Sequence, residues 1–521
     1  MRLTVALLAC SVLACGQHVA HAQDAGSQLT IGWAEPLDTL NPATTGSRNT
    51  GPIMSNIFDT LVWLTSDFKV TPGLATDWKV SKDGLTYTFN LRHDVTFQDG
   101  TAFDAQAVVK NIEYITDKAT QSKIALGLLG PCKTAKATGK YTVTISCEKP
   151  YAPLLTQMGE PYLGMQSPAA IKKYGQDLGQ HPVGTGAFKF VSWQPNQSVV
   201  LQRFDKYNWM PAALKHKGPA KIDKLTFSIV PNPQARINQF QSGQSQVIQQ
   251  VPGLYWKALG ASKRYQSMKV RISGMGIFMP INASKWPTDD VKVRQAILYA
   301  TDRKGIIQLA DNGVFPVSKY PLSEGMLGYD PSIKDYYPYD PDKAAKLLKE
   351  DGWTKANGVW TKDGKPLTVT ISPISTKAEY MAIAQAVQGY LQKIGMVAKV
   401  EPLAISAWLS SAIQGDMTMG TAQYIGVDPD ALHVWFLPGQ YFNWSHWSDP
   451  KLTAMIEQAQ KLNDAAKRKA LYGDIQKIIM ENAVMMPIRQ NLDLTMIAKS
   501  VKGVTYSGGG FQYFGAASLE N

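Results

Sequence analysis

Apolar and polar residues alternate in short runs along the chain, and these runs are interleaved with stretches of helical periodicity. Residues 86–91 and 141–147 place an apolar side chain at every second position, which is the pattern of a half-buried strand. Apolar residues recur at helical spacing over 105–115, 383–394 and 471–479, which predicts helices. Because the two patterns are interleaved throughout, we expect α/β lobes.

Three Asp-Pro pairs mark further helix starts, at Asp340-Pro341, Asp428-Pro429 and Asp449-Pro450. An aspartate side chain accepts hydrogen bonds from the free amides at a helix start, and proline fits the first helical turn. We therefore expect a helix to begin at each pair, with Gly352 ending the first of them.

The first 22 residues have the pattern of a secretory signal peptide. Arg2 precedes an apolar run from Leu3 to Ala14, and small residues follow at Ala20-His21-Ala22. The run is shorter than the roughly 20 apolar residues that span a membrane. We expect cleavage after Ala22 and a periplasmic protein. In the alternative, Val12-Leu13-Ala14-Cys15 is a lipobox and the protein is lipid-anchored at Cys15.

The chain has 521 residues, which suits two or three lobes better than one core. It carries 53 Lys and Arg against 41 Asp and Glu, a net charge of +12. The basic residues are spread along the chain and are not interleaved with aromatic residues in any one stretch. We therefore do not expect nucleic-acid binding.

Two cysteines, Cys132 and Cys147, remain after the predicted cleavage. An exported protein enters an oxidising compartment, so we expect a disulfide between them. Cys147 lies on the apolar face of the predicted strand 141–147, and a turn at Gly139-Lys140 allows Cys132 to lie opposite. The alternative is a pair of buried free thiols.

Sequence motifs of catalysis are missing. The chain contains no G-x-S-x-G, H-E-x-x-H or Walker A sequence, and its histidines are scattered. We expect no catalytic residues, no cofactor and no enzyme activity. His433 and His446 lie close in sequence, which keeps a metal site open as a minor alternative.

Aromatic residues crowd the stretch 424–447. In an irregular segment, such side chains enclose a small ligand at little entropic cost. Packing of a long loop onto its lobe is an equally good interpretation. The residues are Tyr424, Trp435, Phe436, Tyr441, Phe442, Trp444 and Trp447.

Short segments in a fixed order suggest a family. They are LNP at 40–42, IFDTLV at 57–62, PGLA at 72–75, WKVS at 78–81, TYTFNLR at 86–92, VTFQDG at 95–100, PVGTGAF at 182–188, VKVRQA at 291–296, DR at 302–303, YDP at 339–341 and GW at 352–353. Each segment alone is weak, but their number and order are specific. Over nearly all of the mature chain, the sequence resembles the family 5 extracellular solute-binding proteins, the peptide and nickel receptors of ABC importers.

The resemblance implies a type II periplasmic-binding fold of the large, three-lobed form, in which lobes I and III close around the ligand. It implies a receptor that captures a small solute, peptide-like or another organic molecule, for the transmembrane subunits of an ABC importer. We expect a monomer. The expected division is a signal peptide at 1–22, lobe I at 23–65, 187–272 and 494–521, lobe II at 66–186 and lobe III at 273–493.

Two positions depart from the peptide receptors of this family. Those receptors resemble one another in an acidic residue three positions before an Asp-Pro pair, where it holds the peptide ammonium group; here that residue is Ile425. The dipeptide receptors also place an Arg where this chain has the uncharged run Ser372 to Ser375. We expect a flat or singly anionic ligand, a modified peptide or a metal chelate, unless charged anchors lie elsewhere in the fold.

Six residues are predicted to contact the ligand. For Asp428, the role of a helix cap stays open beside that of a ligand acceptor. A nickel-type metal or chelate receptor is the alternative function, and a periplasmic hydrolase is less favoured because no nucleophile has a neighbouring base. The predicted residues are Asn41, Tyr424, Asp428, Trp435, Trp444 and Arg489.

Overall fold

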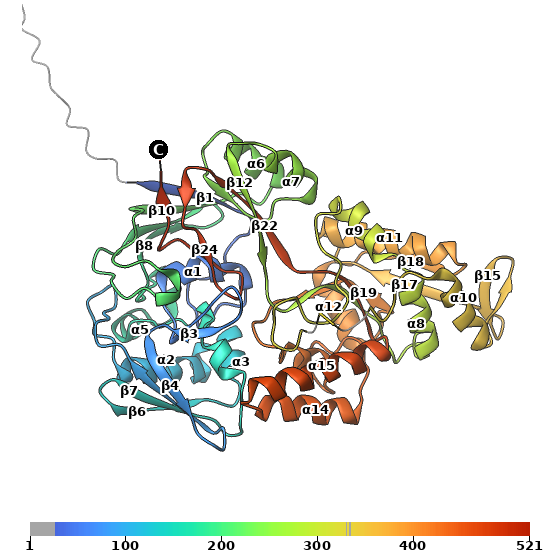
Figure 1. The fold of residues 1–521 in the computed structure, drawn as a ribbon, viewed down its shortest axis with the longest axis horizontal. Coiled ribbons are helices and arrows are strands. Elements are labelled where there is room, and N and C mark those ends of the chain that lie inside the picture. Colours follow the sequence, from blue (N-terminus) through green and yellow to red (C-terminus); the bar gives the residue numbers. More distant parts are fainter. Residues whose placement is uncertain (1–26, 330, 333–334, 521) are drawn as a thin grey trace, which may run out of the picture.

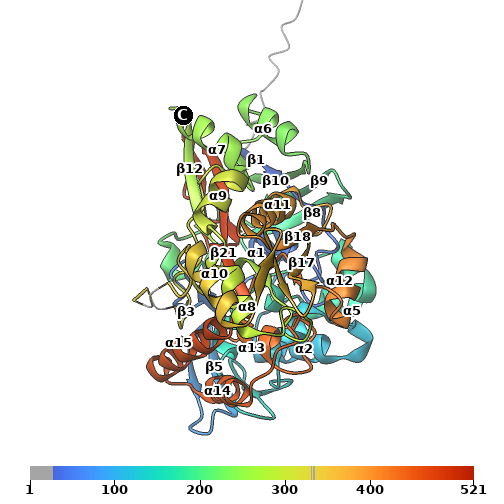
Figure 2. The same ribbon diagram turned by 90° about the vertical axis from the view of Figure 1, so that its right-hand side faces the viewer.

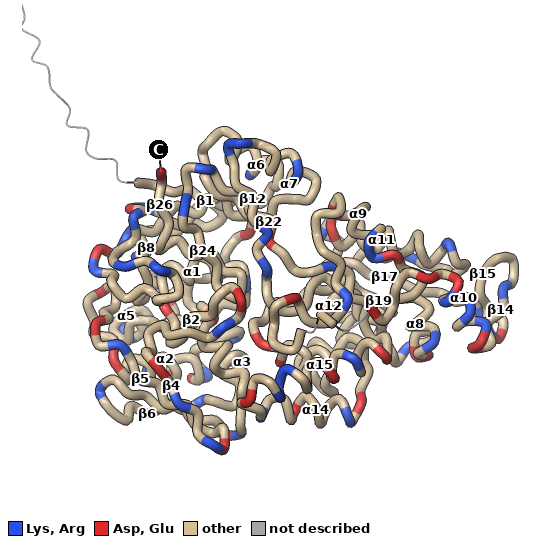
Figure 3. Tube along the Cα trace, viewed as in Figure 1, with Lys and Arg blue, Asp and Glu red and all other residues tan. Residues whose placement is uncertain are grey.

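The computed structural model describes residues 27–329, 331–332 and 335–520. The predicted signal peptide and the alternative lipobox lie outside the described residues. The strands form three groups that define three lobes in space: a large sheet and a four-stranded sheet on one side, and three small three-stranded sheets on the other (Figure 1). Lys and Arg residues are distributed over all three lobes (Figure 3).

Lobe I is built on a seven-stranded sheet with the order β12-β22-β11-β1-β10-β9-β8. Strand β1 runs parallel to both β10 and β11, and its apolar side chains are buried beneath the sheet. The strands are β1 (Gln28–Trp33), β8 (Phe188–Gln194), β9 (Ser198–Arg203), β10 (Lys224–Ile229), β11 (Val247–Ile248), β12 (Tyr265–Arg271) and β22 (Leu492–Ala498); the helices are α1 (Gly51–Ile57), α6 (Pro233–Gln241) and α7 (Gly253–Gly260); short strands are β2 (Val62–Leu64), β3 (Val70–Pro72), β23 (Val501–Lys502), β24 (Thr505–Tyr506), β25 (Gln512–Tyr513) and β26 (Ser518–Leu519).

Lobe II is an antiparallel sheet with the order β4-β5-β7-β6. The predicted alternation is confirmed, since Tyr87, Phe89 and Leu91 of β5 are buried while Asn90 is exposed. The elements are β4 (Ala75–Val80), β5 (Thr86–Leu91), β6 (Thr134–Gly139), β7 (Thr142–Ser146), α2 (Ala105–Thr116), α3 (Ile124–Leu129), α4 (Leu154–Gln157) and α5 (Pro168–Tyr174).

Lobe III contains an antiparallel sheet, β20-β13-β21, and a parallel sheet, β18-β17-β19. The strands are β13 (Met275–Pro280), β14 (Thr354–Ala356), β15 (Val359–Lys362), β16 (Lys365–Pro366), β17 (Thr368–Ser372), β18 (Val397–Val400), β19 (Met419–Gly420), β20 (Ala422–Tyr424) and β21 (Met485–Arg489); the helices are α8 (Val291–Tyr299), α9 (Arg303–Asp311), α10 (Pro341–Glu350), α11 (Ala378–Lys393), α12 (Ile405–Gln414), α13 (Ala431–Phe436), α14 (Pro450–Lys461) and α15 (Ala465–Glu481).

Two of the three Asp-Pro predictions are confirmed. Asp340 accepts from the Lys343 amide at 2.8 Å to begin α10, and Asp449 accepts from the Leu452 amide at 2.8 Å to begin α14. The prediction at Asp428 is wrong. Helix α13 begins at Ala431 with Asp430 as its N-terminal cap residue, and the Asp428 carboxylate accepts from the Asp430 amide before the helix and from Arg468.

The chain crosses between lobes I and III twice. Strand β12 of the large sheet ends at Arg271 and β13 of lobe III starts at Met275; β21 of lobe III ends at Arg489 and β22 of the large sheet starts at Leu492. Because the two crossings are short and adjacent, they form the connection about which the lobes can rotate.

Candidate functional site

Lobe III meets the rest of the molecule through direct polar contacts. The Ala152 amide of lobe II donates to the Gln460 carbonyl at 2.7 Å, and Lys377 Nζ lies 3.8 Å from Glu35 Oε1 of lobe I. Figures 1 and 2 place α14 and α15 at the edge of lobe III that faces lobe II. The lobes are therefore in contact in this conformation.

A buried ion pair lies at this junction. Arg48 Nη1 donates to Glu160 Oε2, and the side chain of Glu160 is 1% exposed while that of Arg48 is 19% exposed. The Arg48 guanidinium also lies over the Tyr162 ring, 5.2 Å from its centre. We call Arg48 and Glu160 the junction pair.

Local structure positions both members of the junction pair. Arg48 begins a single 3-10 turn that Ser47 caps by accepting from the Asn49 amide at 3.2 Å. Glu160 ends the turn after α4, where its own amide donates to the Gln157 carbonyl. Both side chains are thus held by turns and not by long regular elements.

Electrostatics at the junction follow from burial. Burial raises the pKa of Glu160, and the charge of Arg48, together with the Val427 amide of lobe III, opposes that rise. Burial acts to lower the pKa of Arg48, but Glu160, Tyr162 and Tyr424 together raise it above its ordinary value. Arg48 and Glu160 therefore compensate each other's charge. Removal of either one would leave the other as a buried charge without a counter-ion, which would destabilise the fold.

Tyr424 reaches the same junction from lobe III. It ends β20, and its ring packs edge-on against Trp435 and Phe442 at 6.0 and 5.8 Å. Burial raises the pKa of Tyr424, and the nearby Arg48 charge lowers it. The charges of both Arg48 and Glu160 act on the Tyr424 phenol group, so this predicted ligand residue lies near the junction pair.

Trp435 and Trp444 belong to the core of lobe III. They pack edge-on at 4.8 Å, and Trp435 is 2% exposed. Phe278 and Trp408 complete the cluster by contacting one tryptophan each, at 4.7 and 4.6 Å. This placement fits the packing interpretation of the aromatic stretch, and ligand contact by either tryptophan stays a prediction.

The remaining predicted residues have partners within the protein. Asn41 Nδ2 donates to the Tyr114 hydroxyl at 2.9 Å. Arg489 is paired with Glu379 and Asp311 and covers the Phe315 ring at 3.6 Å. Contact of Asn41 or Arg489 with a ligand therefore stays a prediction.

Asp428 is held by an arginine. Arg468 of α15 binds both of its carboxylate oxygens, and the Thr156 hydroxyl of lobe II lies 2.8 Å from Oδ2. The Asp430 amide also donates to Asp428 Oδ1 at 2.9 Å. The carboxylate is thus a buried link between α15, the loop before α13 and lobe II.

His433 and His446, which left a metal site as a minor alternative, contact different residues. His446 Nε2 lies 2.8 Å from the Ala412 carbonyl, and His433 Nδ1 lies 4.0 Å from Asp430 Oδ2. Among the described residues there is no group of three or more His, Cys, Asp or Glu side chains that could hold a metal ion. In the same part of the chain, no helix is long and apolar enough to cross a membrane.

The predicted disulfide is confirmed. Cys132 and Cys147 are bonded to each other. Cys132 lies just before β6 and Cys147 just after β7, and those strands pair from Thr134 with Ser146 onward. The bond therefore closes the open end of the β6–β7 hairpin, as the turn at Gly139-Lys140 had indicated.

A comparison with protein families decides the identity. Residues 69–446 match the family described as bacterial extracellular solute-binding proteins, family 5. The chain belongs to this family. Its members are solute-binding proteins and not enzymes, so this solute-binding protein is the receptor component of an ABC importer.

Its relatives bind different small ligands. A glutathione-binding protein, GsiB of Escherichia coli, is 28% identical over 479 residues, which cover 89% of each chain. NikA from Brucella suis, solved with Fe(III)-EDTA, is 27% identical with a TM-score of 0.85, covering 95% of this chain and 100% of its own. DppA from Helicobacter pylori, a periplasmic binding protein solved with the peptide STSA, is 25% identical with a TM-score of 0.78, covering 95% and 98%.

Sequence reasoning missed the junction pair. Arg48 and Glu160 are 112 positions apart, and neither lies in a segment that carries the family resemblance. The one available signal was the pair of uncharged positions, Ile425 and the run Ser372 to Ser375, which implied that charged anchors lie elsewhere if the ligand is charged.

Proposed function

We propose that this receptor binds a small zwitterionic, peptide-like solute at the junction pair, with glutathione as the first candidate. The observation that carries the proposal is the buried Arg48–Glu160 pair, with Tyr424 of lobe III beside it. The ligand carboxylate would bind Arg48 and its ammonium group would bind Glu160. Tyr424 would cover the bound groups from lobe III.

Binding of a zwitterion would replace the ion pair between Arg48 and Glu160 by two ion pairs with the ligand. A zwitterion in a closed, water-poor site needs an opposite charge for each of its ends. The junction pair offers one of each, and a ligand that separates Arg48 from Glu160 leaves neither of them uncompensated. The uncharged positions at Ile425 and Ser372 to Ser375 supply no such charges, so the junction pair is the better anchor.

Two relatives suggest two different classes of ligand. The glutathione-binding relative supports a modified peptide, because the amino acid at the start of glutathione is linked through its side chain and keeps a free ammonium and carboxylate together. The relative solved with Fe(III)-EDTA supports a carboxylate-rich chelate, which would use Arg48 but leave Glu160 opposed by like charge. We favour the zwitterion because the junction pair carries both signs.

The test is calorimetric titration with reduced glutathione, a panel of free dipeptides and a nickel–histidine chelate. We expect micromolar binding of glutathione, and about a 10- to 100-fold loss of affinity in Arg48→Gln and in Glu160→Gln, the range for a hydrogen bond between charged groups. Arg203→Gln is the matched control, because Arg203 pairs with Asp223 in lobe I. Equal binding of several unrelated dipeptides, or full affinity in Arg48→Gln, would contradict the proposal.

We further propose that the protein acts in the periplasm and delivers its ligand to the transmembrane subunits of its importer. The support is the predicted signal peptide at 1–22 and the periplasmic binding proteins among its structural relatives. Mass spectrometry of the exported protein tests the location: an N-terminus at Gln23 is expected, and a diacylated Cys15 would instead show the lipid-anchored form.

A further inference from the structure

Lobe II touches lobe III at a place separate from the junction pair. Thr156 Oγ1 of α4 lies 2.8 Å from Asp428 Oδ2, and the Ala152 amide donates to the Gln460 carbonyl at 2.7 Å. The Tyr87 hydroxyl lies 3.4 Å from Asn463 Oδ1. We call these three pairs the lobe II–III contact.

Three of the four side chains in the lobe II–III contact have second partners within their own lobes. The Thr156 hydroxyl also lies 2.8 Å from the Pro153 carbonyl, and the Tyr87 hydroxyl donates to the Tyr151 carbonyl at 2.8 Å. On the other side, Arg468 holds both oxygens of Asp428. Separation of the lobes therefore leaves none of these three side chains without a hydrogen-bond partner.

This arrangement differs from that of a permanent packing contact. A buried polar group that loses its only partner costs far more than a hydrogen bond gains, so a contact between such groups resists opening. Here the hydroxyl of Thr156 exchanges Asp428 for Pro153, and the Ala152 amide and the Gln460 carbonyl, which pair across the two lobes, would become hydrated when the lobes separate. The contact can therefore form and break at a small cost.

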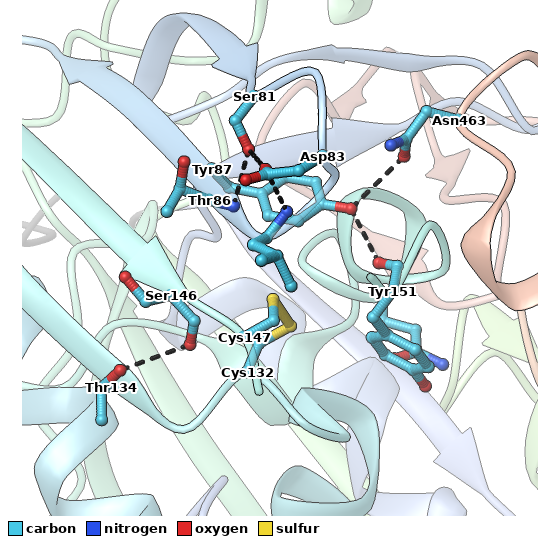
Figure 4. Close-up of a disulfide and its surroundings, with 12 residues drawn as sticks. Ser81, Asp83, Thr86, Tyr87, Cys132, Thr134, Ser146, Cys147, Tyr151 and Asn463 are labelled. Carbon is cyan, nitrogen blue, oxygen red and sulfur yellow. Dashed lines mark hydrogen bonds between the residues drawn. A yellow bond between two sulfur atoms is a disulfide. The ribbon is translucent and has the colours of Figure 1, made fainter. Parts of the chain in front are cut away.

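The lobe II side of the contact is held in place by the disulfide. Cys147 lies directly after β7, and the segment that follows it contains Tyr151, Ala152 and Thr156. Figure 4 shows the Cys132–Cys147 bond beside Tyr87 and Tyr151, with Asn463 of lobe III reaching the Tyr87 hydroxyl. The segment that follows Cys147 therefore contacts lobe III and is anchored at its start by the disulfide-closed β6–β7 hairpin.

We propose that lobe II takes part in closure: the lobe II–III contact forms when the lobes close, breaks when they open, and sets the fraction of closed receptor. The contact includes neither the junction pair nor Tyr424, and its Asp428 is the counter-ion of Arg468. It therefore shifts affinity for every ligand by the same factor, because a ligand that binds the closed form gains or loses with the closed population. This role is independent of the ligand proposed for the junction pair.

The test is hydrogen exchange in the ligand-free protein, measured by mass spectrometry at the amide of Ala152, whose donor bond crosses the contact. Thr156→Val keeps the side-chain shape, keeps Asp428 paired with Arg468 and removes the crossing hydroxyl. We expect exchange at Ala152 to rise about tenfold, the factor for loss of one hydrogen bond to a charged group. Small-angle scattering of the same variant should show a larger radius of gyration.

Thr134→Val is the matched control, because Thr134 is also a lobe II threonine but bonds only to the Ser146 carbonyl within its own sheet. Exchange at Ala152 should be unchanged in it. Asn463→Ala, an exposed change on the other side of the contact, should also raise exchange at Ala152, though less than Thr156→Val. Exchange at Ala152 within twofold of wild type in both Thr156→Val and Asn463→Ala would overturn the proposal.

Discussion

Arg468 and Asp428 are joined by two parallel hydrogen bonds, from Nη1 to Oδ2 at 2.8 Å and from Nη2 to Oδ1 at 2.6 Å. Their side chains are 5% and 2% exposed. Burial acts to lower the pKa of Arg468, but the charge and hydrogen bonds of Asp428, together with Tyr472 and Asp430, raise it overall. The Asp428 carboxylate is therefore the counter-ion of a buried arginine, and through this role it stabilises the folded protein.

Asp428→Asn should lower the free energy of unfolding by about 3–5 kcal/mol, the usual cost of leaving one partner of a buried ion pair without its counter-charge. Urea denaturation measures this loss. Asp449→Asn is the control, because Asp449 is a helix cap and asparagine caps nearly as well. A change of less than 1 kcal/mol in Asp428→Asn would show that the charge pair is unimportant.

The disulfide should be complete in freshly purified protein. Alkylation without reduction is expected to label neither Cys132 nor Cys147, and both should react after reduction and unfolding. The double variant Cys132→Ser/Cys147→Ser should lose about 3 kcal/mol of stability, because the bond closes a loop of 15 residues. Labelling of both thiols before reduction would refute the bond.

Asp59 should make stability depend on pH. Burial raises its pKa from 3.8 to about 7, although Trp209 and Tyr207 donate to it at 3.0 and 3.2 Å. Between those pKa values the native protein keeps a proton that the unfolded chain has released. The stabilisation of the native state by the protonated Asp59 side chain is complete below about pH 4 and is lost as the pH rises towards 7. Asp59→Asn should therefore show a shallower fall of Tm across this range. An equally steep fall in the variant would count against the raised pKa.

Substitutions of Tyr424 and Trp435 should distinguish a role in ligand binding from a role in packing the core of lobe III. Trp435→Leu should cost about 3 kcal/mol of stability, because it removes a ring with aromatic neighbours on several sides. Tyr424→Phe keeps the ring packing and removes only the hydroxyl near Arg48, so it should change Tm little and weaken glutathione binding severalfold. Thermal denaturation and calorimetry measure the two effects. Unchanged glutathione affinity in Tyr424→Phe would remove its hydroxyl from the proposed site.

Local patterns in the sequence determined much of the architecture. Alternation predicted β5 and β7, helical periodicity predicted α2, α11 and α15, and Asp-Pro pairs predicted the starts of α10 and α14. These features depend on residues a few positions apart, whose side chains share a face or satisfy neighbouring amides. The order of short segments also predicted the family, because the same local elements recur in the same order.

Tertiary structure decided what the charged residues do. Asp428 has the same local sequence signal as Asp340 and Asp449, yet it pairs with Arg468, 40 positions away. Arg48 finds Glu160 across 112 positions, and Thr156 reaches Asp428 across 272. A buried charge takes whichever partner the fold brings near, because its desolvation must be compensated. That partner is chosen by tertiary packing, both within a lobe and between lobes, which no local pattern in the chain records.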